Sequence, residues 1–236
     1  MFQNRGGILG GVPPVTLNLI IITLICYIAQ VLLGNAGIDI TNYLGLHFYK
    51  SGQFYPHQLI TYIFMHGSIM HFFFNMFAVF MLGRTLELVW GPKRYLFYYI
   101  ITGIGAGVAQ ELVWLFELRD IVFNPDISSI NIGRTIVERS EFWDYFVTIG
   151  ASGSVFGILV AFGMFFPNAE LMIIPIPVPI KAKYFVILYG ALELFLGVSN
   201  TAGDNVAHFA HLGGLITGLF IVLYWKRKNK INGRFY

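Results

Sequence analysis

The chain alternates long runs of apolar residues with shorter polar segments. Six of these runs approach or reach the length needed to cross a bilayer as a helix, which is about 20 mostly apolar residues. The pattern therefore predicts an all-α membrane protein built as a bundle of six transmembrane helices. The predicted spans cover residues 15–33, 58–82, 95–116, 149–166, 184–198 and 206–225.

Composition agrees with a membrane protein of one domain. Of the 236 residues, 56% are hydrophobic and 11% are charged, and the mean hydropathy is +0.68. Soluble domains average about 25% charged residues. The length suits one bundle, so we expect a single membrane domain over residues 1–236 with its spans within 15–225. A single cysteine, Cys26, excludes a disulfide within this chain.

The basic residues predict an orientation. If both termini are cytoplasmic, the inner segments hold 11 of the 15 Lys and Arg residues and the outer segments hold 4, as the positive-inside rule requires. We therefore expect a multi-pass protein of a prokaryotic inner membrane with both termini cytoplasmic. A long acidic loop at 117–144 would then lie outside. Residues 171–180 are apolar, but three prolines exclude a regular helix, and we expect an extended loop there.

Polar side chains within the predicted spans gather at one depth. Such residues are costly in a bilayer and usually have a partner or a function. In this topology the second, fourth and sixth spans all begin on the outer side, so their polar residues fall in the outer half of the membrane. These residues are His66, His71, Ser152, His208 and His211.

A serine near a histidine is the arrangement that nucleophilic catalysis requires, because a free hydroxyl needs a base to take its proton. Ser152 opens the fourth span, where the first amides of a helix lack partners and can stabilise an oxyanion. His71 and Asn75 lie four residues apart on one helix face and can add side-chain donors. Gly150 and Gly153 would let a substrate backbone approach closely.

Small residues recur at every fourth position on the fourth and sixth spans, and such stripes let two membrane helices pack closely. His211 lies on nearly the same face of the sixth span as its glycines. Close packing of the two spans would therefore bring His211 towards the fourth span. We expect a valine at Gly105 to do less damage than one at Gly157 or Gly214. The stripes consist of Gly153, Gly157 and Ala161, and of Gly214 and Gly218.

The candidate serine and histidine lie in the sequences GASG at 150–153 and AHLGGLITG at 210–218, which follow HGSIMHFFFN at 66–75 and ELVWG at 87–91. In this order and spacing they resemble four motifs of the rhomboid family of intramembrane serine proteases. Those motifs are G-x-S-G, A-H-x-x-G-x-x-x-G, two histidines followed by an asparagine, and E-x-x-x-G. The resemblance extends over about residues 15–225 and implies a rhomboid-like six-helix bundle.

The resemblance implies a role for each matching residue. Ser152 resembles the nucleophile and His211 the general base. His71 and Asn75, with the Ser152 amide, resemble the oxyanion donors. The implied function is that of an endopeptidase that cuts transmembrane segments of other membrane proteins within the lipid bilayer through an acyl-enzyme. No cofactor, no metal and no nucleic acid is implied, and the oligomeric state stays open.

The resemblance also implies supporting positions. Phe156 resembles an aromatic residue that packs against the catalytic histidine, and it lies on the same helix face as Ser152, four residues later. His66 resembles an additional histidine of the second span that is supporting rather than catalytic. The supporting set is Gly150, Gly153, Phe156, His66, Gly214 and Gly218.

Two other functions stay open. One is a catalytically inactive rhomboid-like protein that binds membrane proteins. The other is a metal or haem protein that uses the span histidines, although this function explains neither Ser152 nor the glycines.

No carboxylate is expected to complete a triad. Asp204 precedes the candidate base by seven residues and is expected in a loop. Glu111 and Glu193 are expected to be buried carboxyl groups that are either partnered or protonated, and His208 is expected to be a structural neighbour. His211 would then be oriented by packing alone.

Overall fold

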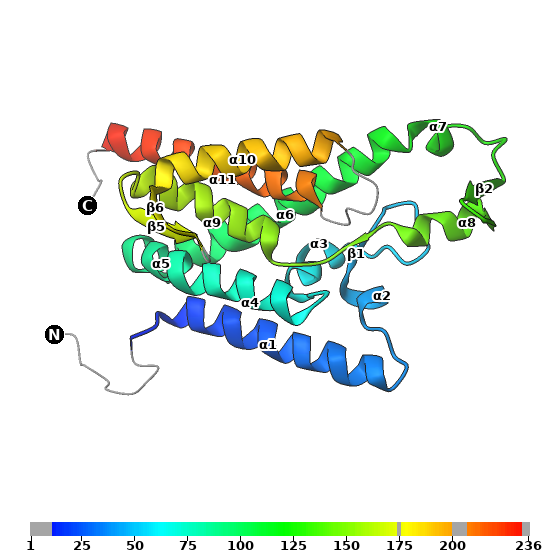
Figure 1. Ribbon diagram of the computed structural model, residues 1–236, viewed down its shortest axis with the longest axis horizontal. Coiled ribbons are helices and arrows are strands. Elements are labelled where there is room, and N and C mark those ends of the chain that lie inside the picture. The colour runs from blue at the N-terminus through cyan, green and yellow to red at the C-terminus, as the bar shows by residue number, and fades with distance from the viewer. Residues whose placement is uncertain (1–10, 174–175, 200–206, 233–236) are drawn as a thin grey trace.

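The computed structural model describes residues 11–173, 176–199 and 207–232 (Figure 1). Long helices run side by side along the longest axis of the molecule, and short elements lie towards both of its ends. The long helices are α1 (Pro14–Asn35), α4 (Ile69–Ala78) continuing through η2 (Val79–Gly83) into α5 (Arg84–Trp90), α6 (Pro92–Glu117), α9 (Ser152–Phe165), α10 (Ala182–Ser199) and α11 (His208–Asn232).

The predicted helical membrane bundle is confirmed. Among the described residues, five helices are long and apolar enough to cross a membrane. The fourth predicted span is a shorter apolar helix, α9, of 14 residues. The chain is therefore a multi-pass integral membrane protein with five full-length candidate spans and one short helix among them.

Because α9 is short, Ser152 at its start lies part way along the neighbouring helices and not level with their ends. Fourteen residues rise only about 21 Å, whereas the hydrocarbon core is about 30 Å thick. Figure 1 shows α9 beginning part way along its neighbours, after an extended approach. That approach contains β4 (Val147–Thr148), which pairs antiparallel with β1 (Leu46–His47). Irregular backbone at this depth is tolerated where protein buries it or where it lines a water-filled cavity.

The second predicted span, 58–82, has the wrong bounds. Residues Gln58–Thr61 (α3) and Tyr62–Phe64 (η1) form a separate helical segment, and the spanning helix covers Ile69–Trp90. Ser68 causes the break, because its extended backbone and its hydroxyl, which accepts from the amide of His71, cap the new helix. Hydropathy does not distinguish two apolar segments from one, and His66 therefore lies in the loop before the span.

The E-x-x-x-G sequence has a structural explanation. The buried carboxylate of Glu87 accepts hydrogen bonds from the amides of Val15 and Thr16 and from the Thr16 hydroxyl, at 2.7–2.9 Å. It therefore caps the first turn of α1 and joins that helix to α5. Gly91 ends α5 with a φ of +79°, a conformation that glycine adopts without strain.

The expected close packing of the fourth span on the sixth is confirmed. A Cβ added at Gly214 of α11 would overlap the carbonyl oxygen of Gly153 on α9. One added at Gly218 would lie 3.0 Å from the Cα of Gly157. The two helices therefore meet backbone to backbone along their glycines.

The third span takes part in this contact, which makes the expectation for Gly105 wrong. A Cβ added at Gly105 of α6 would overlap the side chain of Thr217 on α11, and one added at Gly153 would overlap Ala106 of α6. Helix α6 therefore lies against both α9 and α11. The pattern did not reveal this contact because Gly105 faces a threonine rather than a second glycine stripe.

The segment between α6 and α9 folds on its own small core. It comprises α7 (Arg119–Val122), a hairpin of β2 (Ser129–Ile132) and β3 (Thr135–Glu138), α8 (Arg139–Phe142) and η3 (Trp143–Tyr145). The short helix α2 (Thr41–Leu44) lies at the same end. Trp143 packs there with Phe48 and Trp114 in a buried aromatic cluster. The apolar stretch after α9 is also more regular than expected, since β5 (Glu170–Ile173) and β6 (Ile176–Lys181) pair as an antiparallel hairpin.

Candidate active site

Ser152 and His211 meet between the first turns of α9 and α11. Ser152 is the first residue of α9, and His211 lies in the first turn of α11. The distance between Ser152 Oγ and His211 Nε2 is 2.8 Å, within hydrogen-bonding range. The serine is partly accessible and the histidine is buried. The glycine contact between α9 and α11 sets this distance, because it fixes the spacing of the two helices just below the pair.

Two neighbours hold the His211 ring. The ring stacks on Phe156, with centroids 4.5 Å apart and planes 12° from parallel. Its Nδ1 atom lies 2.9 Å from Oε2 of Glu193 on α10. A neutral imidazole has one N–H and one lone pair, so donating Nδ1–H to the carboxylate leaves the Nε2 lone pair facing the hydroxyl. In that tautomer Ser152 donates its hydrogen to His211.

Glu193 is the functional residue that the sequence did not reveal. The expectation that His211 has no carboxylate partner is wrong. Glu193 Oε2 also lies 2.7 Å from Nδ1 of His208, and all three residues are buried. An intramembrane glutamate signals that a partner exists, but the sequence did not reveal that α10 would pack beside the first turn of α11. Asp204 lies outside the described residues.

Gly150 brings a second histidine next to the serine. Its φ of +129° favours glycine, and a Cβ built there would lie 2.7 Å from His71 Cε1 and 3.7 Å from Ser152 Oγ. Because His71 fills that space, the small residue here serves the approach of a protein side chain. Asn75 uses one of its two amide hydrogens to donate to the carbonyl of His71, at 2.8 Å.

His66 supports the segment that leads into the helix. Its ring is almost fully buried, stands edge-on to His71 with centroids 4.9 Å apart, and faces the amide of Ala151 at 3.5 Å from Nε2. Burial, together with the neighbouring His71, lowers the pKa of His66 to about 4. The imidazole is therefore neutral at neutral pH and can accept from the Ala151 amide.

The remaining serine of the motif has a structural partner. Ser154 is buried, and its hydroxyl donates to the carbonyl of Tyr99 on α6 at 2.8 Å. Tyr98 of the same helix donates to the carbonyl of Gly157 at 2.7 Å. These bonds fix α9 against α6 and leave Ser152 as the serine that faces a histidine.

The span histidines do not form one metal site. In the part of the chain that the structure describes, the one group of three or more possible metal ligands is Glu193, His208 and His211, whose ligand atoms lie within 4.8 Å of one another. His66 and His71 do not belong to it. The idea of a site built from all four histidines therefore does not fit the described residues.

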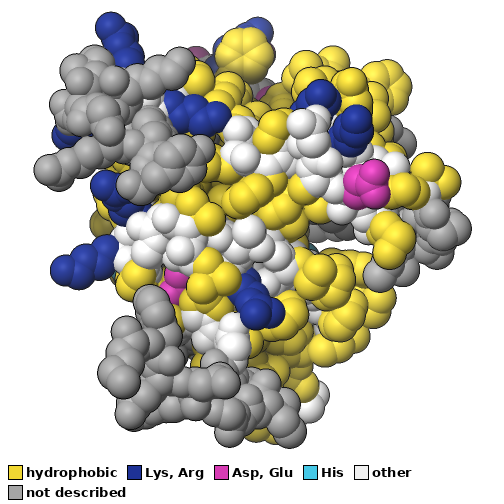
Figure 2. Space-filling view, turned by 90° about the vertical axis from the view of Figure 1, so that its left-hand side faces the viewer, with side chains coloured by type: hydrophobic (Ala, Val, Ile, Leu, Met, Phe, Trp, Pro, Cys, Tyr) yellow, Lys and Arg dark blue, Asp and Glu magenta, His cyan; other side chains and the backbone are white. Residues whose placement is uncertain are grey.

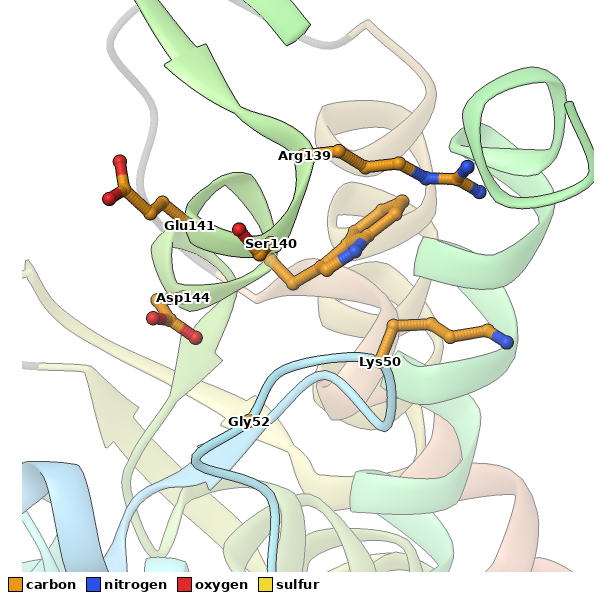
Figure 3. Close-up of a pocket in the computed structure, with 7 residues that line it drawn as sticks. Lys50, Gly52, Arg139, Ser140, Glu141 and Asp144 are labelled. Carbon is orange, nitrogen blue, oxygen red and sulfur yellow. The ribbon is translucent and has the colours of Figure 1, made fainter. Parts of the chain in front are cut away.

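A hollow at the segment between α6 and α9 lies apart from this site. It is lined by residues of the loop after β1 and by α8 with η3, and none of the site residues described above in this subsection contributes to it. Figure 3 shows Lys50 and Arg139 extending to one side of this hollow and Glu141 and Asp144 to the other. It is an open depression of mixed charge, and it has no contact with Ser152 or His211.

Comparison with known proteins points to one family. A family model described as the Rhomboid domain matches residues 52–228. The chain is 22% identical over 216 residues to the protein named Rhomboid protease GlpG of Yersinia pestis (strain Pestoides F), covering 92% of this chain and 64% of that protein. It is 28% identical over 166 residues to Rhomboid protease AarA of Providencia stuartii, covering 66% of this chain and 51% of that protein. The chain thus spans less than two thirds of the length of these relatives.

Proposed function

This chain belongs to the rhomboid family, and from that premise we propose that it is an intramembrane serine endopeptidase with Ser152 as nucleophile and His211 as general base. The observation that carries the proposal is the 2.8 Å contact between Ser152 Oγ and His211 Nε2. The pair lies at a depth where an unpartnered hydroxyl and imidazole would be costly.

The chemistry follows from the tautomer of the base. Ser152 Oγ attacks the scissile carbonyl carbon while its proton passes to His211 Nε2. The resulting imidazolium gives that proton to the leaving amine, and an acyl-enzyme remains on Ser152. Water then repeats the sequence, with His211 as base and Ser152 as leaving group, and releases the second product.

The oxyanion of each tetrahedral intermediate would be held by the start of α9. The amide of Ser152 is one of the first amides of the helix, which have no partner within it. His71, which reaches the space beside Gly150, and Asn75 would add side-chain donors. Gly150 and Gly153 support this arrangement by their lack of a side chain, and His66 supports it through Ala151.

The substrate would be a transmembrane segment of another protein, cut within the bilayer. We place both termini in the cytoplasm and the 117–144 segment outside, in the inner membrane of a prokaryote. The positive-inside rule supports this orientation. At the end of the bundle where α1 begins and α11 ends, Lys and Arg side chains are spread over the surface and few acidic side chains are seen (Figure 2). The proposal treats residues 1–236 as one rhomboid-like membrane domain.

A fluorophosphonate probe tests the dyad. We expect the purified protein to be labelled at Ser152, and Ser152→Ala to abolish labelling. His211→Ala should slow labelling by about 10²–10⁴-fold, the usual effect of a general base. Ser154→Ala is the matched control, because it removes a hydroxyl two residues away that bonds to Tyr99, and it should keep the label.

Two outcomes would argue against the dyad. Labelling that persists in Ser152→Ala would show that another residue reacts. Labelling that is lost on chelation and restored by Zn²⁺ would show that Glu193, His208 and His211 hold an ion instead, since their ligand atoms lie close enough to do so.

A further inference from the structure

We propose that Glu193 is a positioning residue that extends the Ser152–His211 dyad to a triad. In this triad His208 holds the Glu193 carboxylate in place. The inference rests on the proposed function and adds a carboxylate from α10 to it. The geometry points to this role because Glu193 Oε2 lies 2.9 Å from His211 Nδ1, on the side of the ring opposite the serine contact.

A single carboxylate oxygen serves two histidines. Glu193 Oε2 lies 2.7 Å from His208 Nδ1 as well, and the two imidazole planes are nearly perpendicular, at 88°. A carboxylate that is 4% exposed within a membrane helix is costly unless N–H groups satisfy it. The Nδ1–H groups of His208 and His211 supply those bonds, so both neutral rings carry their hydrogen on Nδ1.

This arrangement fixes the base for its task. With Nδ1–H given to Glu193, the lone pair of His211 is on Nε2 and faces the Ser152 hydroxyl. Phe156 restrains the ring from its face, and the bond from Nδ1 to Glu193 opposes a flip of the ring about its Cβ–Cγ bond. Packing on Phe156 alone would allow that flip, which preserves the stacking but exchanges Nδ1 with Cδ2 and takes Nε2 away from Ser152.

The carboxylate also lies where charge develops. When the Ser152 O–H bond breaks and an N–H bond forms at Nε2, His211 becomes an imidazolium. The ionised Glu193 is then 2.9 Å from the positive ring and stabilises it. Glu193 stays ionised throughout, and Nδ1–H stays on the histidine. The proton taken from Ser152 leaves with the amine when the C–N bond breaks, so the step is balanced.

His208 holds the carboxylate in place. It lies one turn before His211 on α11, so both imidazoles face α10 from the same side of their helix. Its short contact to Oε2 keeps that oxygen between the two rings. Removing His208 would therefore loosen Glu193 without touching Ser152 or His211 directly.

The test compares Glu193→Gln with Glu193→Asp, His208→Gln and a matched control, Glu111→Gln. Glu111 is another carboxyl group of a membrane helix, and its Oε2 accepts from the amide of Tyr49 rather than from a residue of the site. We expect Glu193→Gln to lower kcat for cleavage by at least about 10-fold and by up to about 10⁴-fold, the effect of removing the carboxylate of a Ser-His-Asp triad, with KM within about twofold. Glu193→Asp should restore part of the loss, His208→Gln should lie between, and Glu111→Gln should match the wild type.

A spectroscopic readout separates positioning from stability. The His211 Nδ1–H proton, bonded to a buried carboxylate, should give a strongly downfield proton resonance that is absent in Glu193→Gln and in His211→Ala. A kcat in Glu193→Gln equal to that of the wild type, with only the melting temperature lowered, would make the carboxylate a clip between α10 and α11 and would overturn the proposal.

Failure of the proposed function gives a different result. If the wild type is neither labelled by a fluorophosphonate nor able to cleave a substrate, the endopeptidase proposal fails, and with it the catalytic meaning of Glu193. If the wild type is active and loses that activity on chelation, the three residues bind an ion, and the positioning role is overturned while hydrolysis stands.

Discussion

Each small residue in GASGS at 150–154 meets a different neighbour. Gly150 makes room for the ring of His71, Gly153 makes room for the side chain of Ala106, and the backbone of Gly153 fills the space that Gly214 leaves open. Ser154 donates to α6. The sequence showed that small residues were required, and the stripe predicted one of the partners. The ring beside Gly150 could not be predicted, because it depends on a loop geometry that hydropathy does not encode.

We expect His66 to make the stability of the folded protein sensitive to acid. Its pKa is about 4 in the folded protein, against an ordinary value of 6.5. Between these values the unfolded chain binds a proton that the folded chain does not, so stability is lost as the pH falls from about 6.5 to about 4. The loss would reach roughly 3 kcal/mol at pH 4, from about 1.4 kcal/mol per pKa unit.

Thermal unfolding in detergent, followed over this pH range, measures the effect on a Ser152→Ala background that prevents self-cleavage. We expect His66→Gln to flatten the fall in melting temperature between pH 6.5 and 4, even if it lowers stability at pH 7. Parallel curves for the two proteins would show that His66 gains a proton as easily in the folded state as in the unfolded state.

At the scale of elements, the contact between α9 and α11 positions the dyad. The glycines of the two helices touch through backbone atoms, and any added methyl group must push the helices apart. Gly214 is one turn below His211, so a shift there would lengthen the contact between Ser152 and His211. The helix pair therefore couples packing to activity.

Gly214→Ala tests this coupling. A Cβ at this position would overlap the Gly153 carbonyl oxygen, and overpacking of this kind typically costs about 1–3 kcal/mol. We expect a lower melting temperature and a loss of cleavage larger than the loss of folded protein. Gly34→Ala is the matched control, since Gly34 is also helical, has a negative φ and has open space within 4 Å of an added Cβ. Equal effects at Gly34 and Gly214 would contradict a specific role for the contact.

Element boundaries were predicted well where the apolar run coincided with one helix. The first, third and fifth spans differ from the helices α1, α6 and α10 by a few residues at most. The second span failed because the cap at Ser68 divides one apolar run into two segments. The fourth began three residues late, at Ser152, because Gly150 bends the backbone before the helix starts.

On the scale of the whole molecule, four helices each contribute one side chain to the candidate active site. Helix α4 brings His71, α9 brings Ser152, α10 brings Glu193 and α11 brings His211. Polar spacing and glycine stripes predicted the meeting of serine and histidine from the sequence. Glu193 could not be placed from the sequence, because no stripe or motif relates α10 to α11.

The most direct measurement is cleavage of a single-span membrane protein of known orientation, co-expressed with this chain in bacteria, with the cut mapped by mass spectrometry. We predict that the wild type cuts within the transmembrane segment, in the half towards the outer side. Ser152→Ala and His211→Ala, expressed to the same level, should give no product above background. A product that persists in Ser152→Ala would contradict the serine mechanism, and a cut in the cytoplasmic half would contradict the orientation that places Ser152 towards the outside.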